Sequence, residues 1–205
     1  MKNNTVFYIV RHGQTVWNIE HKVQGHTDSP LTEIGLQQAE NLAKTFRNIQ
    51  FDVALSSDLL RAKKTAEIIT LEKKLAITTT EHLREQYYGQ AEGKSSAPYV
   101  ALWEEWRKLS DEEQMKQRIV SDAESDEEVA TRFITFLREA AVAYPGKTVL
   151  IVSHGSMMCT LLVKLGFASY TSLIGIENCG WYRLESDGID FFLKETFGVT
   201  VNEQK

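Results

Sequence analysis

The chain has 205 residues, of which 42% are hydrophobic and 25% are charged, and its formal net charge is −5. This length and composition predict one globular domain with a full core and exclude a transmembrane chain, and the negative charge argues against broad nucleic-acid binding. The only two cysteines, Cys159 and Cys179, lack metal-ligand spacing and favour a reduced, cytoplasmic protein.

The first predicted element is a strand over residues 6–10. It consists of five apolar residues, which is typical of a strand buried on both faces of a parallel sheet. Met1 to Asn4 lead directly into this strand, so no signal peptide is expected. Arg11 and His12 follow the strand, and ligands of open α/β sheets bind just beyond the carboxyl ends of strands. The sequence therefore predicts a binding site at these two residues.

Helices and strands then alternate. Residues 16–31 are expected to form a polar connection outside the core. The pattern next predicts a helix over 32–48 capped by Thr32, a strand over 52–56, a helix over 57–71 with Leu59, Leu60, Ala62, Ala66 and Ile69 inward, and an edge strand over 75–80. Arg61 falls in the first turn of its helix, where free backbone N–H groups and a positive charge would favour an anion. A solvated surface arginine is the alternative.

The region from about 86 to 124 changes character, because it is helical in tendency and rich in acidic residues. We interpret it as a cap inserted over the carboxyl ends of the strands, within a single domain that spans 1–205. Its aromatic residues, Trp103 and Trp106, are expected to serve packing more than substrate recognition. Its acidic run at 111–113 is expected to be a solvated face.

The second half repeats the opening arrangement. A capping box at Ser125 predicts a helix to about Tyr144, and an apolar strand over 148–152 precedes Ser153-His154-Gly155. The elements that follow are a buried helix over 157–165 and a hairpin of strands over 181–185 and 189–193 around Asp187-Gly188. These elements predict an α/β fold with a mostly parallel sheet that is mixed at one edge.

Two buried strands thus each deliver an imidazole, and their carboxyl ends can bring His12 and His154 to one edge of one sheet. The alternative is that each histidine only caps its strand. Two histidines, two arginines and a carboxylate suit phosphoryl transfer, in which catalysis is mostly positioning and electrostatic stabilisation. His12 can attack phosphorus if one ring nitrogen is unprotonated, and the neighbouring arginine disfavours the imidazolium.

The remaining groups have roles in the same scheme. Arg11 and Arg61 would bind the phosphoryl oxygens with their fork-shaped donors. His154, if protonated, would share one of those oxygens, and a carboxyl such as Glu85 would protonate the leaving oxygen. The chain has no P-loop, no dinucleotide fingerprint, no Gly-x-Ser-x-Gly elbow and no HExxH motif. The sequence therefore disfavours P-loop nucleotide chemistry, dinucleotide binding, serine hydrolysis and catalysis by a metal bound at such a motif.

Taken in order, these motifs resemble the histidine phosphatase superfamily, the phosphoglycerate-mutase-like proteins. The resemblance spans about residues 5–160 and rests on Arg11-His12-Gly13-Gln14-Thr15 with Asn18, Gln24-Gly25, Asp28 to Gly35, Ser56-Ser57 leading to Arg61-Ala62, Leu83-Arg84-Glu85 and Ser153-His154-Gly155. It implies a three-layer α/β/α sandwich that needs no metal or other cofactor. It makes His12 the phosphohistidine, Glu85 the proton donor, and Arg11, Arg61 and His154 the phosphate pocket. The substrate-binding residues that we predict are Gly13, Gln14, Thr15, Asn18, Gln24, Gly25 and Gly155.

The acceptor of the phosphoryl group separates the enzymes of this family. Mutases typically carry a longer, more basic insertion after the glutamate, whereas here 68 residues separate Glu85 from His154 and the cap is acidic. The loop Val23-Gln24-Gly25-His26 also differs from the mutase pattern. We therefore expect a phosphomonoester hydrolase for a small phosphorylated metabolite, with no nucleic-acid or membrane partner, as a monomer or homodimer. The alternatives are a cofactor-dependent phosphoglycerate mutase and a non-catalytic regulatory protein.

Overall fold

A six-stranded mixed sheet forms the centre of the protein, whose computed structural model describes residues 4–201. The strands are β1 (Thr5–Arg11), β2 (Val53–Ser57), β3 (Ile77–Thr80), β4 (Thr148–Ser153), β5 (Leu173–Ser186) and β6 (Phe191–Val201), in the order β3-β2-β4-β1-β5-β6. The first four run parallel to one another, and β5 and β6 add an antiparallel edge, which confirms the predicted mixed sheet. The prediction for the chain start involves residues 1–3, which lie outside the described residues.

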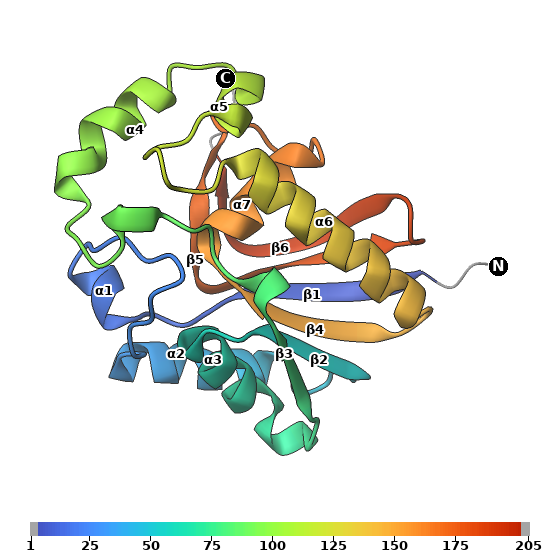
Figure 1. Ribbon diagram of the computed structural model, residues 1–205. Helices are drawn as coiled ribbons and strands as arrows, with labels where there is room; N and C mark the ends of the chain where they lie inside the picture. The colour runs from blue at the N-terminus through green and yellow to red at the C-terminus, as the bar shows by residue number, and fades with distance from the viewer. Residues whose placement is uncertain (1–3, 202–205) are drawn as a thin grey trace.

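Helices cover both faces of this sheet, which confirms the predicted α/β/α sandwich (Figure 1). The α-helices are α1 (Val16–Ile19), α2 (Glu33–Thr45), α3 (Leu60–Thr70), α4 (Val100–Trp106), α5 (Asp111–Lys116), α6 (Asp126–Ala143) and α7 (Gly155–Lys164). Four 3-10 turns accompany them: η1 (Leu71–Lys73), η2 (Glu81–Leu83), η3 (Gly89–Ala91) and η4 (Ala97–Tyr99). Helices α6 and α7 pack on one face, and α2 and α3 pack on the other. No helix in the described part of the chain is long and apolar enough to cross a membrane.

The central strands β1 and β4 are apolar on both faces because each face meets a helical layer. Phe7 and Ile9 belong to the core beneath α6 and α7, whereas Val10 belongs to the core above α2 and α3. Strand β4 alternates in the same way, and Arg11 pairs with Ser153 in the parallel register. The residues that follow these two positions, His12 and His154, therefore leave the sheet side by side.

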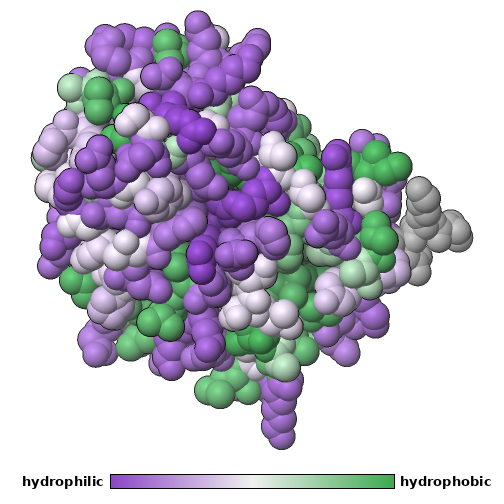
Figure 2. All heavy atoms as spheres, in the orientation of Figure 1, coloured by the Kyte–Doolittle hydropathy of each residue, from purple (hydrophilic) through white to green (hydrophobic). Residues whose placement is uncertain are grey.

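The cap segment, residues 86–124, lies at the carboxyl ends of the parallel strands and carries η3, η4, α4 and α5 (Figure 1). These helices have 7 residues at most, and most of their side chains are exposed. Hydrophilic residues cover most of the face seen in Figure 2, including the part over α4 and α5. The cap segment is therefore built from short, well-hydrated elements, in contrast to the layers around the sheet.

Several local predictions need correction. Helix α3 begins at Leu60 rather than near Ser57, and the Leu60 side chain is 66% exposed instead of inward, since it stands at the first helical position. The connection over 16–31 is not merely polar loop, because it contains α1 and buries Val23. That burial follows from backbone hydrogen bonds between Val23 and the 93–94 segment of the cap. The predicted N-caps of α2 and α6 and the turn at 187–188 are confirmed.

Candidate active site

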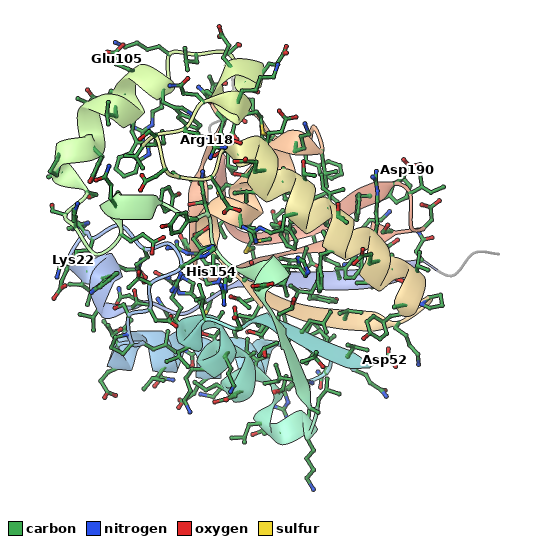
Figure 3. The ribbon with its side chains drawn as sticks, viewed as in Figure 1. Lys22, Asp52, Glu105, Arg118, His154 and Asp190 are labelled. Atoms are coloured by element: carbon green, nitrogen blue, oxygen red, sulfur yellow. The ribbon has the colours of Figure 1, made fainter. Side chains whose placement is uncertain are left out.

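The two predicted histidines meet at the carboxyl ends of β1 and β4. Their ring centroids are 5.2 Å apart, and the rings are inclined edge to face. His12 is 3% exposed and His154 is fully buried, near the middle of the molecule in Figure 3, whereas Lys22, Asp52 and Glu105 lie at its periphery. Adjacent parallel strands therefore bring together two imidazoles that are 142 positions apart in the sequence.

His12 is held as a nucleophile requires. Its Nδ1 lies 2.7 Å from the carbonyl oxygen of Gly13, so Nδ1 donates a hydrogen bond and Nε2 carries the free electron pair. Burial, together with the charges of Arg61 and Arg11, holds the pKa of His12 well below its usual value of 6.5. The ring is therefore neutral near pH 7.

His154 is also neutral, which differs from the protonated form considered from the sequence. Burial, with the charges of Arg61, His12 and Arg11, holds the pKa of His154 well below 6.5. Both of its ring nitrogens are buried without a hydrogen-bond partner in the described part of the protein. A phosphoryl dianion placed beside the ring would favour its protonation and accept its N–H groups.

In the described part of the chain, buried nitrogens without a hydrogen-bond partner gather around these rings. Among the described residues, seven buried side-chain polar atoms lack a partner, and four of them are both nitrogens of His154 and the Nε atoms of Arg11 and Arg61. Because buried polar groups are normally hydrogen-bonded, such a cluster indicates a place where an anion binds. The pKa of each arginine is lowered by burial, and the nearby Glu85 carboxylate opposes that shift.

Arg61 is fully buried, which excludes the surface-arginine alternative, but its contacts differ from the expectation. Its Nη atoms donate to the carbonyls of Gly25 at 2.7 Å and Thr27 at 3.1 Å, and it pairs with Asp28 at 3.0 Å. Asp28 also accepts from the backbone N–H groups of Leu60 and Arg61. The start of α3 is thus capped by a carboxylate and offers fewer free donors to a phosphate than predicted.

Glu85 comes from the segment between η2 and the cap, and its carboxylate is fixed against the start of α7. Its Oε1 accepts from the N–H groups of Gln86 at 2.9 Å and Met157 at 3.0 Å, and its Oε2 accepts from Ser156 at 3.2 Å. The side chain is 7% exposed and lines the same cavity as Arg11. The structure thus places a carboxylate beside the basic cluster.

The predicted substrate-binding residues shape the loop after β1. The N–H of Gly13 donates to Thr65, and Gly13 packs against Gly35 so closely that a Cβ would lie 2.5 Å from the Gly35 oxygen. Thr15 caps α1, and its capping box uses Asn18. The other predicted residues are also engaged: Gln14 accepts from Thr32, Gln24 accepts from Thr15, and Gly155 leaves room for Arg11. These contacts support the loop, and their roles toward substrate stay predictions.

A cavity of about 670 Å³ opens beside this cluster. Its lining residues come from the sheet end, α7 and the cap segment: Arg11, Glu85, Gln86, Tyr88, Trp103, Trp106, Arg107, Ile119, Asp126, Gly155, Ser156, Cys159, Thr160, Tyr170, Thr171, Leu173, Gly175 and Ile176. Both tryptophans of the cap therefore line the cavity, which adds a contact surface to their packing role. Trp106 packs edge to face on Tyr170 at 4.8 Å and donates to the carbonyl of Gln114.

Sequence reasoning missed several contributors to the site. The side chain of Asn178 donates to the carbonyl of His12 at 3.1 Å, and Asp126 accepts from Tyr170, Gln86 and Thr160 at the cavity wall. Burial raises the pKa of Asp126, and its three donors oppose that shift. These residues lie in a long strand and at a helix start, and no local pattern distinguishes them. Only the fold brings them to the site.

Comparisons with known proteins address the family of the chain and its fold. A sequence model of the histidine phosphatase superfamily (branch 1) matches residues 7–197. The chain is 36% identical over 161 residues to the uncharacterized phosphatase PhoE of Bacillus subtilis (strain 168), covering 78% of this chain and 77% of that protein. It is 35% identical over 180 residues to the probable phosphoglycerate mutase GpmB of Yersinia pestis (strain Pestoides F), covering 87% and 83%. The structure of a mycobacterial glucosyl-3-phosphoglycerate phosphatase in complex with VO3 superposes with a TM-score of 0.82 at 26% identity, covering 95% of this chain and 99% of that one.

Proposed function

The chain belongs to the histidine phosphatase superfamily, and from that premise we propose that it hydrolyses small phosphomonoesters through a phosphohistidine on His12. The observation that carries the proposal is the neutral His12 ring, with Nδ1 bonded to Gly13 and with His154 and two arginines around it. A buried imidazole with one fixed tautomer is a competent nucleophile, and the basic groups stabilise charge on the phosphoryl oxygens.

In the first step, Nε2 of His12 attacks phosphorus and the bond between phosphorus and the ester oxygen breaks. As the proposed acid, the Glu85 carboxyl gives a proton to that oxygen, so the alcohol leaves neutral. Arg11, Arg61 and His154 donate to the three phosphoryl oxygens, whose charge they offset. The N–H groups at the start of α7 support this step by fixing the orientation of the carboxyl.

In the second step, water attacks the phosphohistidine. The Glu85 carboxylate takes a proton from the water, the bond between phosphorus and Nε2 breaks, and inorganic phosphate leaves. His12 returns to its neutral form and Glu85 to its protonated form. The same carboxyl thus acts as acid and then as base, so each cycle consumes one water and leaves the enzyme unchanged.

The lining of the cavity favours hydrolysis over a mutase reaction. A bisphosphorylated primer would need cations for its second phosphate, but among the described residues that line the cavity only Arg107 is basic and outside the proposed phosphate pocket. The lining also includes the Asp126 carboxylate and the aromatic side chains of Tyr88, Trp103 and Trp106. Such a lining suits an uncharged or apolar alcohol better than a second phosphate.

The free thiols of Cys159 and Cys179 support a proposed reducing, cytoplasmic location.

A phosphoglycerate mutase is the second candidate. Arg107, whose guanidinium has no ion pair within the described residues, would be available to a substrate carboxylate, and the relative GpmB is named a probable phosphoglycerate mutase. In that reaction the phosphohistidine passes its phosphoryl group to a second hydroxyl instead of to water.

One experiment separates the two candidates. We expect the purified protein to release inorganic phosphate from several small phosphomonoesters and to leave the ratio of 2- to 3-phosphoglycerate unchanged when a bisphosphorylated primer is added. Interconversion stimulated by the primer would favour the mutase. A folded protein that turns over no phosphomonoester would contradict the proposed hydrolase.

A further inference from the structure

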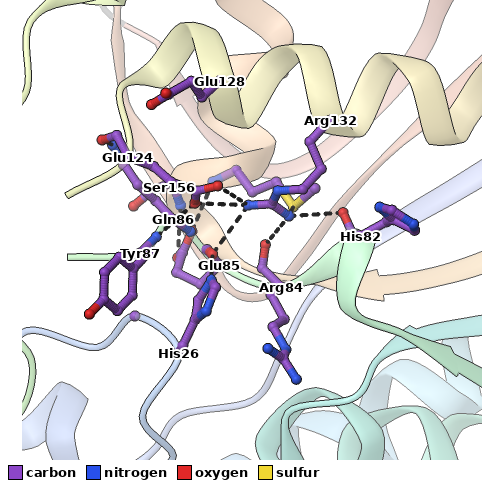
Figure 4. Close-up of polar contacts among 12 residues, drawn as sticks. His26, His82, Arg84, Glu85, Gln86, Tyr87, Glu124, Glu128, Arg132 and Ser156 are labelled. Carbon is purple, nitrogen blue, oxygen red and sulfur yellow. Dashed lines mark hydrogen bonds and ion pairs between the residues drawn. The ribbon is translucent and has the colours of Figure 1, made fainter. Parts of the chain in front are cut away.

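The guanidinium of Arg132, on α6, binds the main chain that carries Glu85 (Figure 4). Its Nη1 donates to the carbonyls of His82 and Arg84, both at 2.9 Å, and its Nη2 donates to the carbonyl of Glu85 at 3.4 Å. One side chain thus contacts three of the four consecutive residues that end at the proposed acid. None of these carbonyls belongs to the helix of Arg132, so the contacts hold two separate elements together.

The same guanidinium reaches the base of the cap segment. Its Nη2 lies 3.0 Å from a carboxylate oxygen of Glu124, which also accepts from the N–H of Tyr87 at 2.9 Å. The N–H of Glu124 in turn donates to the carbonyl of Tyr87 at 2.8 Å. Tyr87 and Glu124, near the two ends of the cap segment, therefore meet at this point, and Arg132 links their junction to α6.

These contacts bear on the orientation of the Glu85 carboxylate. The main-chain carbonyl of Glu85 accepts from Arg132 of α6 and lies 3.0 Å from Nε2 of His26, which is in the loop before α2. The side-chain carboxylate of Glu85 accepts from the N–H groups of Ser156 and Met157, so α7 is a third element that holds this residue. The Glu85 side chain has rotatable bonds between its main chain and its carboxylate. A displaced main chain would therefore displace the carboxylate, so both must be held in place. The Arg132 side chain is only 19% exposed, so its hydrogen bonds to the carbonyls are partly shielded from water.

We propose that Arg132 is a positioning residue for Glu85, which holds the proton donor in line with the leaving oxygen and links that alignment to the base of the cap. This inference rests on the proposed hydrolase function and adds a residue to it. Arg132 does not touch the reacting atoms in this scheme. It acts through the main chain of residues 82–85, and a displacement of about 1 Å in a catalytic group can cost on the order of 100-fold in rate.

The test compares two substrates that differ in their need for a proton. The leaving group of p-nitrophenyl phosphate departs as a stabilised phenolate, whereas the alkoxide of ethyl phosphate must be protonated as it leaves. For Arg132→Ala we expect kcat/KM for ethyl phosphate to fall about 100-fold and kcat/KM for p-nitrophenyl phosphate to change by less than about threefold. The quantity kcat/KM is chosen because it ends with transfer to His12 and excludes the later hydrolysis of the phosphoenzyme.

Three further variants complete the design. Arg138→Ala removes an arginine from the same helix. Among the described residues its guanidinium donates only to the carbonyl of Ile189, so kcat/KM for both substrates should be unaffected. Arg132→Lys keeps the charge but loses the fork that contacts several carbonyls, and it should give an intermediate loss for ethyl phosphate alone. If Arg132→Ala does not fold, Glu124→Gln, which weakens the ion pair, should show a smaller loss with the same preference.

The outcomes separate this inference from the function on which it rests. An equal fall of kcat/KM for both substrates, with an unchanged circular dichroism spectrum, would show that Arg132 supports the site as a whole and not Glu85 in particular. That result would overturn the proposal. No fall for either substrate would overturn it as well. If the wild-type protein hydrolyses neither substrate, the proposed function itself fails. Normal wild-type activity with no substrate preference in the variants overturns only the role of Arg132.

Discussion

The two ends of the site differ in how they are built. The proposed phosphate end consists of buried residues at the carboxyl ends of adjacent strands and in α3, and His12, His154 and Arg61 are each at most 3% exposed. The proposed leaving-group end is lined by α7, the start of β5 and the cap segment, whose helices are short and whose residues Glu104, Glu105 and Arg107 are exposed. Within residues 4–201, four buried nitrogens at the first end have no hydrogen-bond partner, whereas the second end has aromatic side chains that contact one another.

This difference assigns different work to the two ends. A preorganised set of donors in a buried place stabilises the charge of any transferred phosphoryl group, whatever alcohol it is attached to. A hydrated cap with aromatic walls contributes contacts that depend on the alcohol. Changes at the phosphate end should therefore affect all substrates alike, and changes at the cap end should depend on the substrate.

The largest effect is expected from His12→Ala. Without the nucleophile no covalent path exists, so kcat/KM should fall by about 10⁴-fold or more for every phosphomonoester. The measurement is phosphate release from an aryl and an alkyl ester with the same preparation. Residual activity that differs strongly between the two esters would show that the phosphate end does not act alike on all substrates.

His154→Gln should cost less, because one group that stabilises charge is lost while the nucleophile remains. We expect kcat/KM to fall by about 100- to 1000-fold, equally for aryl and alkyl esters. His82→Gln is the matched control, since that exposed ring packs only on Phe136 in the described structure. A loss confined to alkyl esters would assign His154 to leaving-group protonation instead.

Stability should depend on pH through the same two rings. The pKa values of His12 and His154 lie well below 6.5 in the folded protein, so the unfolded chain binds more protons once the pH falls below about 6.5. The free energy of unfolding should then decrease by up to about 1.4 kcal/mol per pH unit for each histidine, down to its folded-state pKa, with no such loss above pH 7. Urea unfolding of the wild-type protein and of His154→Gln between pH 5 and pH 8 measures this loss of stability. An equal slope of the unfolding free energy against pH in both proteins would contradict the assignment of this loss to His154.

The smallest effect is expected at the cap. Trp106→Ala removes one aromatic wall of the cavity, and an edge-to-face aromatic contact is worth about 0.5–1.5 kcal/mol. We expect KM for bulky aryl phosphates to rise by about two- to tenfold, while the inhibition constant of inorganic phosphate stays constant. A parallel rise in both constants would show that the two ends are not separable.

The sequence predicts that His12 and His154 meet, because the signals for this are local. Each histidine directly follows a run of apolar residues, and adjacent parallel strands need only the sheet to bring the rings together. Arg61 is harder, because its partner Asp28 lies 33 positions away and takes the helix N–H groups that seemed free for an anion. Arg132 carries no signal at all, since an arginine in an amphipathic helix is ordinary. The sequence predicts the cap as a segment that is helical in tendency but not the bounds of its short helices, although the capping box of Ser110 and Glu113 at the start of α5 is a local signal.

The central claim is that the phosphoryl group resides on His12 between the two steps. Rapid quenching in alkali after mixing the enzyme with a phosphomonoester, followed by peptide mass spectrometry, measures this directly. The account predicts an acid-labile, alkali-stable phosphohistidine at His12 that is absent from His12→Ala. Turnover of the substrate with no phosphoenzyme at any time, or with the phosphoryl group on another residue, would contradict it.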